Sequence, residues 1–247
     1  MRRTTPLALV LVYSLFAVFS LFAIAGGLTG CGGLSNLATI SFDLPPQNFS
    51  FDTASSMWKA PPSSFPSVAC GTGQAVTDCC FPPAPVPTPD CTATPLECEN
   101  SVCVLEFPIN VSQTINLKMQ VPSLSSLSGQ TLATISISKV TYTIASTMNV
   151  DLPPVDVFIA PSNVTSASDP AAQKFGTIPA SPANMTTTGN MTLDPNGGAV
   201  FSQYATAFST PFNFIAHATM IVAPNTPIPS GTVNATVTGK VSAKPSL

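Results

Sequence analysis

Apolar and polar residues alternate with a period of two along much of the chain beyond residue 37, as expected of half-buried β-strands. Residues 212–222 are apolar on both faces, as expected of a central strand. About eight strands at this spacing predict an all-β fold, an immunoglobulin-like antiparallel β-sandwich. The alternating segments are 38–44, 105–111, 115–121, 133–144, 155–159 and 233–241.

One change of phase predicts a bulge. The apolar positions run through Ile135 and Ile137 and then resume one residue late at Val140. In a regular strand, a shift of one residue would point the apolar side chains of the second half away from the core. A β-bulge near Ser138 and Lys139 is therefore expected to keep the apolar side chains of both halves facing the core.

Proline pairs predict where strands stop, because proline cannot donate a backbone hydrogen bond to a central ladder. Pro45 and Pro46 are expected to end the first strand, with a short second strand over 49–51. The pair at 153–154 predicts an edge or a crossing between sheets.

The remaining connections are read from turn residues. The segment from Asp169 to Lys174 is the only helical candidate, and 194–198 carries a strong turn signal. The turn at 224–231 is short, and sequential strands joined by a short turn usually pair. We therefore expect 212–222 to pair antiparallel with 233–243.

Six of the seven cysteines lie within one 34-residue stretch. An even, clustered set in an exported chain predicts three disulfides in a loop-rich insertion. About a dozen pairings remain open once a bond between two adjacent cysteines is set aside. The six are Cys70, Cys79, Cys80, Cys91, Cys98 and Cys103.

The same stretch raises the question of a metal site. It contains no Cys-x-x-Cys pair, and the single histidine of the chain, His217, is far away in sequence, so no metal and no cofactor are expected. A calcium site made by the acidic residues of the loop stays open as an alternative to simple solvation. Those residues are Asp78, Asp90, Glu97 and Glu99.

The N-terminus has the layout of an export signal. Arg2 and Arg3 precede a 19-residue apolar run from Leu7 to Ala25, and small residues follow. A run of this length is also close to that of a membrane-spanning helix, so an uncleaved anchor is the alternative.

The sequence Leu28, Thr29, Gly30, Cys31 resembles the lipobox of bacterial lipoproteins. The resemblance implies cleavage before Cys31, which then carries a diacylglycerol and an amide-linked fatty acid such as palmitate. Gly32 stands where an Asp would favour retention in the inner membrane, which implies the outer membrane. With its cysteine cluster and strand pattern, the chain resembles predicted lipoproteins of Gram-negative bacteria, a resemblance that brings no activity with it.

This reading divides the chain into a signal peptide at 1–30, a tether at 31–36 and one β-sandwich domain at 37–247, with the disulfide-rich loop at 70–103. Both arginines fall in the signal peptide, which leaves six lysines against eleven acidic residues, a net charge of −5. The sandwich therefore offers no basic patch for nucleic acid. The expected partners are the membrane, through the lipid, and an envelope protein or polysaccharide.

Motifs for catalysis are missing from the sequence. There is no Gly-x-Ser-x-Gly, His-Glu-x-x-His, phosphate-binding loop or dinucleotide fingerprint. We interpret His217 as a structural histidine, and Asp151 and Asp156 as loop carboxylates that flank the 153–154 corner. Trp58 is interpreted as a buried anchor. No catalytic residue is predicted, and the protein is not expected to be an enzyme.

Three function classes follow. The favoured one is an envelope lipoprotein that serves as a structural or binding module. A secreted or membrane-anchored eukaryotic glycoprotein and an extracytoplasmic hydrolase that uses carboxylates are the alternatives. The glycoprotein alternative rests on six Asn-x-Ser/Thr sequons, at Asn48, Asn110, Asn163, Asn184, Asn190 and Asn234.

Overall fold

The computed structural model describes residues 39–53, 65, 67, 69–70, 96–125 and 132–245. The chain divides into two units, Met1–Asn36 and Leu37–Leu247. All of the described residues belong to the second unit, and the account below concerns that unit alone.

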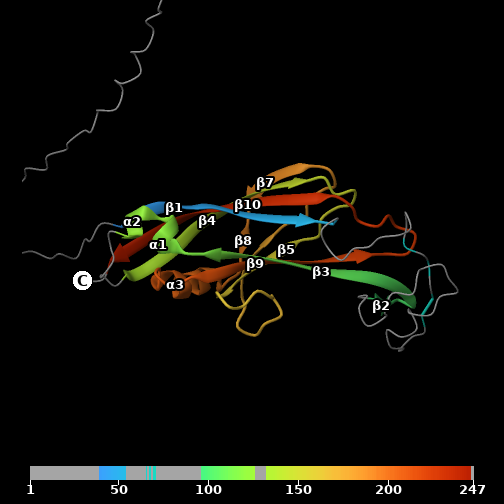
Figure 1. The fold of residues 1–247 in the computed structure, drawn as a ribbon, viewed down its shortest axis with the longest axis horizontal. Helices are drawn as coiled ribbons and strands as arrows, with labels where there is room; N and C mark the ends of the chain where they lie inside the picture. The colour runs from blue at the N-terminus through green and yellow to red at the C-terminus, as the bar shows by residue number, and fades with distance from the viewer. Residues whose placement is uncertain are drawn as a thin grey trace, which may run out of the picture. The chain divides into compact units, whose positions relative to one another are not determined.

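The described residues of the second unit form two antiparallel sheets, which confirms the predicted all-β sandwich. Figure 1 shows β1 and β10 in one layer and β3 and β9 in the other. The four-stranded sheet has the order β1 (Ile40–Asp52), β10 (Thr232–Pro245), β4 (Leu132–Ser146), β7 (Thr186–Asn190). The six-stranded sheet has the order β2 (Leu96–Glu99), β3 (Val102–Ile115), β9 (Phe212–Val222), β5 (Val155–Pro161), β6 (Gln173–Ile178), β8 (Thr192–Leu193).

The pairs of strands are nested. β1 pairs with β10, β3 with β9, β4 with β7, and β5 with β6, all antiparallel. Such nesting arises when one long antiparallel hairpin is rolled into two layers, and it is the connection pattern of a jelly roll. The short strands β2 and β8 extend the second sheet at its two edges.

Aromatic side chains fill one end of the core. Phe214 stacks on Phe175 with the ring centroids 5.4 Å apart, and the Phe201 ring meets Phe212 edge-on at 6.5 Å. All four side chains are buried. Aromatic burial of this extent is a major source of stability in a core, so this cluster fastens a helix, which carries Phe201, to the six-stranded sheet.

Phe201 comes from α3 (Gly197–Thr206), a helix where the sequence pattern predicted only the turn at 194–198. The helix packs against β4 and β6. Gly197 is required at its start, because a Cβ there would clash with the Phe175 carbonyl oxygen. The helical spacing of Val200, Phe201, Tyr204 and Ala205 was the sequence signal for this helix.

The prolines of β1 do not end the strand, so that prediction was wrong. β1 continues from Ile40 to Asp52, and its register against β10 shifts between Leu44 and Gln47. β1 lies at the edge of its sheet, so it pairs with a neighbouring strand on one side only. A proline on the other side interrupts no hydrogen bonds between strands. A bulge on an edge strand is where proline is tolerated.

The bulge predicted in β4 is confirmed. Ile137 pairs with Val241 and Lys139 with Lys240, so Ser138 is the extra residue. The predicted crossing at 153–154 is confirmed as well, since β4 and β5 belong to different sheets.

Two other local predictions were wrong. The row 115–121 is not a strand: β3 ends at Ile115, and α1 (Leu117–Gln120) and α2 (Pro122–Ser125) follow. The Asn116 side chain accepts a hydrogen bond from the Met119 backbone and caps α1. The expected helix from Asp169 is a turn, in which the Asp169 carboxylate accepts from the Ala171 backbone, and β6 begins at Gln173.

The expected pairing of 212–222 with 233–243 was also wrong. β9 pairs with β3 and β5, whereas β10 pairs with β1 and β4. The segment 224–231 therefore crosses from one sheet to the other. Both strands have inward-facing apolar rows, and each is central in its own sheet, so they meet face to face rather than edge to edge.

Candidate functional site

An apolar cavity of about 70 Å³ lies between the two sheets of the described sandwich. Sixteen residues line it, contributed by β1, β3, β4, β5, β6, β9, β10 and the link between β4 and β5. Fifteen of them are apolar, and the other is Ser50. No titratable side chain is among the described residues that line the cavity.

Small side chains on facing strands explain the cavity. The inward row of β9 is large at Phe214 and Met220 but holds alanine at 216 and 218. Val233 and Ala235 of β10 line the cavity from the other sheet. Stacked sheets lie about 10 Å apart, so short side chains on both sides leave the space between them unfilled.

A second void of about 10 Å³ lies beside the cavity, and Phe49, Val157 and Val237 line both of them. Towards the solvent, Phe51 and Ile109 of the wall are only half-buried and Ser50 is exposed. The cavity therefore lies close to the surface, where the edge strand β1 and the strand β3 meet across the sandwich.

An empty cavity of this kind is costly. Buried water needs two to four polar partners, which a wall with a single hydroxyl does not supply. An apolar ligand would cover the apolar side chains of this wall, so the chemistry of the site is the binding of apolar groups.

A polar row crosses the outer face of the six-stranded sheet. His217 of β9 lies between Asn110 of β3 and Asp156 of β5 in direct cross-strand register. The His217 Nδ1 atom is 3.0 Å from Asn110 Oδ1. The ring of Phe158 meets the imidazole edge-on, with the centroids 6.4 Å apart.

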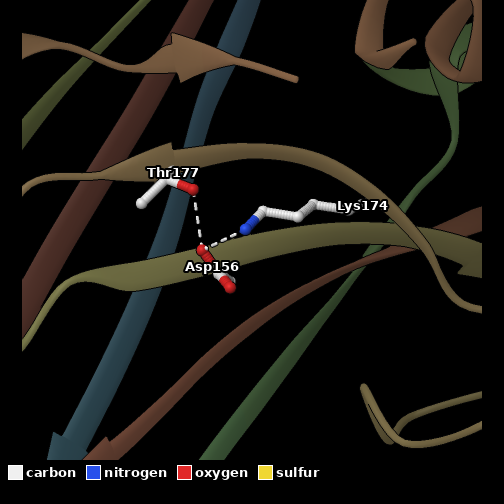
Figure 2. Close-up of polar contacts among 3 residues, drawn as sticks. All are labelled: Asp156, Lys174 and Thr177. Atoms are coloured by element: carbon white, nitrogen blue, oxygen red, sulfur yellow. Dashed lines mark hydrogen bonds and ion pairs between the residues drawn. The ribbon is translucent and has the colours of Figure 1, made fainter. Parts of the chain in front are cut away.

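Asp156 is held by two partners from β6, as Figure 2 shows. Lys174 Nζ lies 2.8 Å from Asp156 Oδ1, and the Thr177 hydroxyl donates to the same oxygen at 2.7 Å. Burial opposes ionisation of Asp156, but these hydrogen bonds and the positive charge of Lys174 outweigh it, so the pKa of the carboxyl is lowered. Asp156 is thus a paired strand residue and not the solvated loop carboxylate that was predicted.

His217 and the two candidate carboxylates do not form one site. Asp151 accepts a hydrogen bond from the Ala183 backbone at 2.8 Å and is exposed. Only Asp156 shares the strand register with His217. The structural role predicted for His217 agrees with this geometry, because its Nδ1 atom is engaged by Asn110 on an open sheet face.

The outer face of the four-stranded sheet is rich in hydroxyl and amide groups. Thr236 of β10 donates to Asn48 Oδ1 of β1 at 2.9 Å, and Thr141 and Thr238 share a hydrogen bond of 2.7 Å. A shallow hollow of about 320 Å³ lies over this face, with Thr188 among its walls. Hydroxyl and amide ladders of this kind offer both donors and acceptors to a polar partner.

Among the predicted disulfide residues, Cys70 and Cys98 form a bond, with their Cα atoms 6.0 Å apart. Cys103 is buried and also disulfide-bonded. Cys98 and Cys103 are opposite each other in the ladder of β2 and β3, so the bonded cysteines fasten the edge of the six-stranded sheet. Cys79, Cys80 and Cys91 lie outside the described residues, and the full pairing stays a prediction.

The acidic residues near this edge influence one another. Burial raises the pKa of Glu106, and the negative charges of Glu97 and Glu99 raise it further. No group of three or more potential metal ligands occurs among the residues that the structure describes. Asp78 and Asp90, the other members of the calcium alternative, lie outside them.

Three further sequence predictions also fall outside the described residues. They concern the signal peptide, the lipid attachment at Cys31 and the burial of Trp58. Within the described part of the chain, no helix combines the length and the apolar character needed to cross a bilayer.

Comparisons with known proteins give no family. No family model matches the chain, and no curated protein matches it. Among solved structures, turnip yellow mosaic virus is similar at 15% identity and a TM-score of 0.25, over 68% of this chain and 87% of that one. Desmodium yellow mottle tymovirus is similar at 16% identity and a TM-score of 0.23, over 68% and 95%. At these TM-scores the likeness supports no statement about this protein.

Sequence reasoning missed the cavity. The signal was present as two alanines at 216 and 218, in a row of alternate residues that otherwise holds Phe212, Phe214, Met220 and Val222. This signal did not predict a cavity as long as β9 and β10 were expected to pair side by side in one sheet. Only their placement in opposite sheets makes the small residues of both strands face each other.

Proposed function

We propose that this protein is a lipid-anchored lipoprotein of the cell envelope whose β-sandwich serves as a binding module and not as an enzyme. The observation that supports the proposal best is the composition of the cavity wall, which is apolar at every described position except Ser50. A site of this kind can hold an apolar molecule but has no acid, base or nucleophile to act on it. The titratable residues Asp156 and His217 belong to the outer sheet face instead.

The anchoring part of the proposal rests on the sequence. Cys31 follows the apolar run in the order that resembles a lipobox, and Gly32 favours the outer membrane. Two or more acyl chains hold a protein stably on a bilayer, since each buried methylene contributes about 0.8 kcal/mol. The membrane is thus the first partner, reached through the lipid.

An envelope polysaccharide or protein is proposed as a second partner. The hydroxyl and amide face of the four-stranded sheet favours it, because Thr236, Thr143 and Thr188 stand in one register row across three strands. Replacement of Thr143 by Lys would place a charge in the middle of this row. The variant is expected to lose retention on isolated cell-wall polymer, while Lys substituted at Thr219, on the other sheet, retains it.

One observation favours the glycoprotein alternative. Every one of the six sequon asparagines is exposed, so glycans could be attached without unfolding the sandwich. The intact mass of the purified protein separates the two alternatives. Triacylation of a chain that begins at Cys31 supports the lipoprotein, whereas hexose-bearing adducts would contradict it.

The anchoring test uses the Cys31→Ala variant, expressed in a Gram-negative bacterium beside the unaltered protein. The unaltered protein is expected to enter the detergent phase of a cloud-point extraction and to incorporate labelled palmitate. The variant should remain in the aqueous phase or as unprocessed precursor. A variant that still partitions into detergent after signal cleavage would rule out lipidation at this residue.

A further inference from the structure

We propose that the end of the sandwich from which the tether leaves docks on the anionic phospholipids of the membrane that holds the lipid anchor. The inference rests on the proposed function, because it takes Cys31 as the anchored residue, and it adds a protein surface that contacts the bilayer. Three features support it: the place where the tether joins the fold, the distribution of charged side chains, and one exposed methionine.

The chain enters the fold close to its anchor. Ile40, the first residue of β1, is nine residues after Cys31, and nine residues span at most about 30 Å when fully extended. Ile40 pairs with Ala243 near the end of β10, and Figure 1 shows α1 and α2 at this same end of the sandwich. We call the start of β1, the end of β10, α1 and α2 together the tether end. A lipid at Cys31 would keep the tether end within reach of the bilayer surface.

Basic side chains gather at the tether end although the chain is acidic overall. Lys118 is in α1, and Lys244 is near the end of β10. Lys139 and Lys240 are in register with each other across β4 and β10, and Lys240 is also in register with Asp43, the fourth residue of β1. All four lysines are exposed. Asp43 offsets one of their charges, so the described residues of the tether end keep a net positive charge.

These lysines are available to a negatively charged partner. Lys174, the fifth lysine that the structure describes, pairs with Asp156, whereas no ion pair of the other four is found among the described residues. Like charges directly opposite each other in a sheet repel, so Lys139 and Lys240 destabilise each other in the isolated protein. A surface of lipid phosphates would relieve this repulsion, and each lysine near such a surface strengthens binding about fivefold.

The opposite end of the sandwich is acidic. Asp52 is the last residue of β1, and Glu97 and Glu99 are in β2, which lies at the far end from α1 and α2 in Figure 1. Glu106 of β3 is in register with Ile221 near the end of β9. A negatively charged bilayer attracts the tether end and repels this one, so the charge distribution orients the sandwich with the tether end on the lipid.

An apolar side chain stands among the lysines. Met119 follows Lys118 in α1 and is 79% exposed, more than any other large apolar side chain among the residues that the structure describes. Exposure to water is unfavourable for such a side chain, whereas the interface of a bilayer accepts apolar groups beside basic ones. Met119 thus favours a lipid surface over nucleic acid, whose phosphates cover no apolar layer.

The test measures which side chains the bilayer shields. The protein is purified from a Gram-negative host, its acylation is read from the intact mass, and it is placed on vesicles of phosphatidylcholine alone or of an equimolar mixture with phosphatidylglycerol. Methionine oxidation by peroxide and lysine acetylation by a water-soluble reagent are followed by mass spectrometry.

Met119 and Lys244 should react about threefold or more slowly on the anionic vesicles than on the neutral ones, and added salt should restore their rates. Met185 and Lys174 are the internal controls. Met185 is 52% exposed and bonds Ser146 at the other end of the four-stranded sheet, and Lys174 is in β6. Both should react equally on the two kinds of vesicle.

Substitutions at exposed positions provide matched variants that keep the fold. Lys240→Gln combined with Lys244→Gln should lower the ratio of docked to undocked protein about twenty-five-fold, since each lysine contributes about fivefold, and Met119 should lose its shielding. Lys174→Gln removes a lysine outside the tether end and should leave the shielding of Met119 unchanged. Met119→Ser should speed the acetylation of Lys244 on anionic vesicles, whereas Met185→Ser should not.

The outcomes separate the docking surface from the anchor. If the intact mass shows no acylation, the lipid anchor fails, and sedimentation of the same protein with the two kinds of vesicle tests the docking: binding to the anionic vesicles alone supports it, and binding to neither overturns it. In an acylated protein, equal shielding of Met119 on neutral and anionic vesicles would overturn the docking surface and leave the anchor standing. Shielding that persists in the folded double-lysine variant would overturn it as well.

Discussion

Ala218 of β9 and Ala235 of β10 line the same cavity from opposite sheets. The two residues are close in sequence, with only the second part of β9, one connection and the start of β10 between them. Their strands nevertheless do not pair with each other. The short connection at 224–231 carries the chain across the sandwich, so the face of β9 meets the face of β10. Because the residues on both of these facing surfaces are small, a cavity remains between them. Pairing of the two strands edge to edge in one sheet would not have formed it.

Phe214→Ala is expected to destabilise the fold by about 3 to 5 kcal/mol. Phe214 is buried and touches both Phe175 and Phe212, and it also lines the smaller void, so its loss joins new empty volume to an existing one. Chemical denaturation measures the effect. Ile221→Ala on the same strand is the control, because Ile221 is 51% exposed and should cost little.

Gly231→Ala is expected to destabilise by more than 1 kcal/mol. Gly231 has φ = +132°, a conformation that L residues rarely adopt. A Cβ there would also lie 2.5 Å from the Thr147 carbonyl oxygen. Thermal unfolding measures the loss, and Gly198→Ala, where a Cβ meets nothing, serves as the control. Equal melting temperatures for the two variants would contradict the strain at Gly231.

Removal of the bond between Cys70 and Cys98 by Cys98→Ser should destabilise by about 3 to 4 kcal/mol, since the bond spans 28 residues. Without a reductant, the denatured unaltered protein is expected to show no free thiol. Under full reduction the stability difference between variant and unaltered protein should disappear. Two or more free thiols in the unaltered protein would contradict the framework of three disulfides.

The pair of Asp156 and Lys174 should make stability depend weakly on acid pH. The pKa of Asp156 is lowered in the fold, so its ionised form contributes stability above the ordinary carboxyl value of 3.8. That contribution is lost as the pH falls through the lowered pKa. The two side chains are 35% and 41% exposed, so solvent screening limits the coupling to less than about 1 kcal/mol.

A double-mutant cycle with Asp156→Asn and Lys174→Gln measures this coupling between pH 2 and 7. The coupling free energy should be present at neutral pH, vanish at the acid end and decrease with added salt. A coupling that grows as the pH falls would contradict the assigned direction of the pKa.

His217→Gln should change stability by less than about 0.5 kcal/mol, as expected at a surface position. A glutamine can keep a hydrogen bond to Asn110, and no second carboxylate shares the register row of His217 with Asp156. Ligand binding in the cavity should be unaffected, because His217 is on the opposite face of β9 from the lining. Loss of a hydrolytic activity on this substitution would revive the hydrolase alternative.

Local sequence patterns were sufficient for features that depend on a single strand. The phase change before Val140 located the bulge at Ser138, because side-chain direction alternates strictly along a strand and one buried face must be kept. The doubly apolar 212–222 became the central strand β9 with the predicted bounds. Whether a residue is buried depends mainly on its own side chain, so the pattern of apolar residues is enough to predict which positions face the core.

Strand pairing and the cavity were decided only by the tertiary structure. Pro45 and Pro46 were tolerated because β1 is an edge strand, and an edge exists only once the sheet is assembled. The order of strands depends on contacts between residues far apart in sequence, such as those of β1 with β10. Alternation specifies which face of a strand is buried but not what it is buried against, and the cavity is a property of two faces brought together.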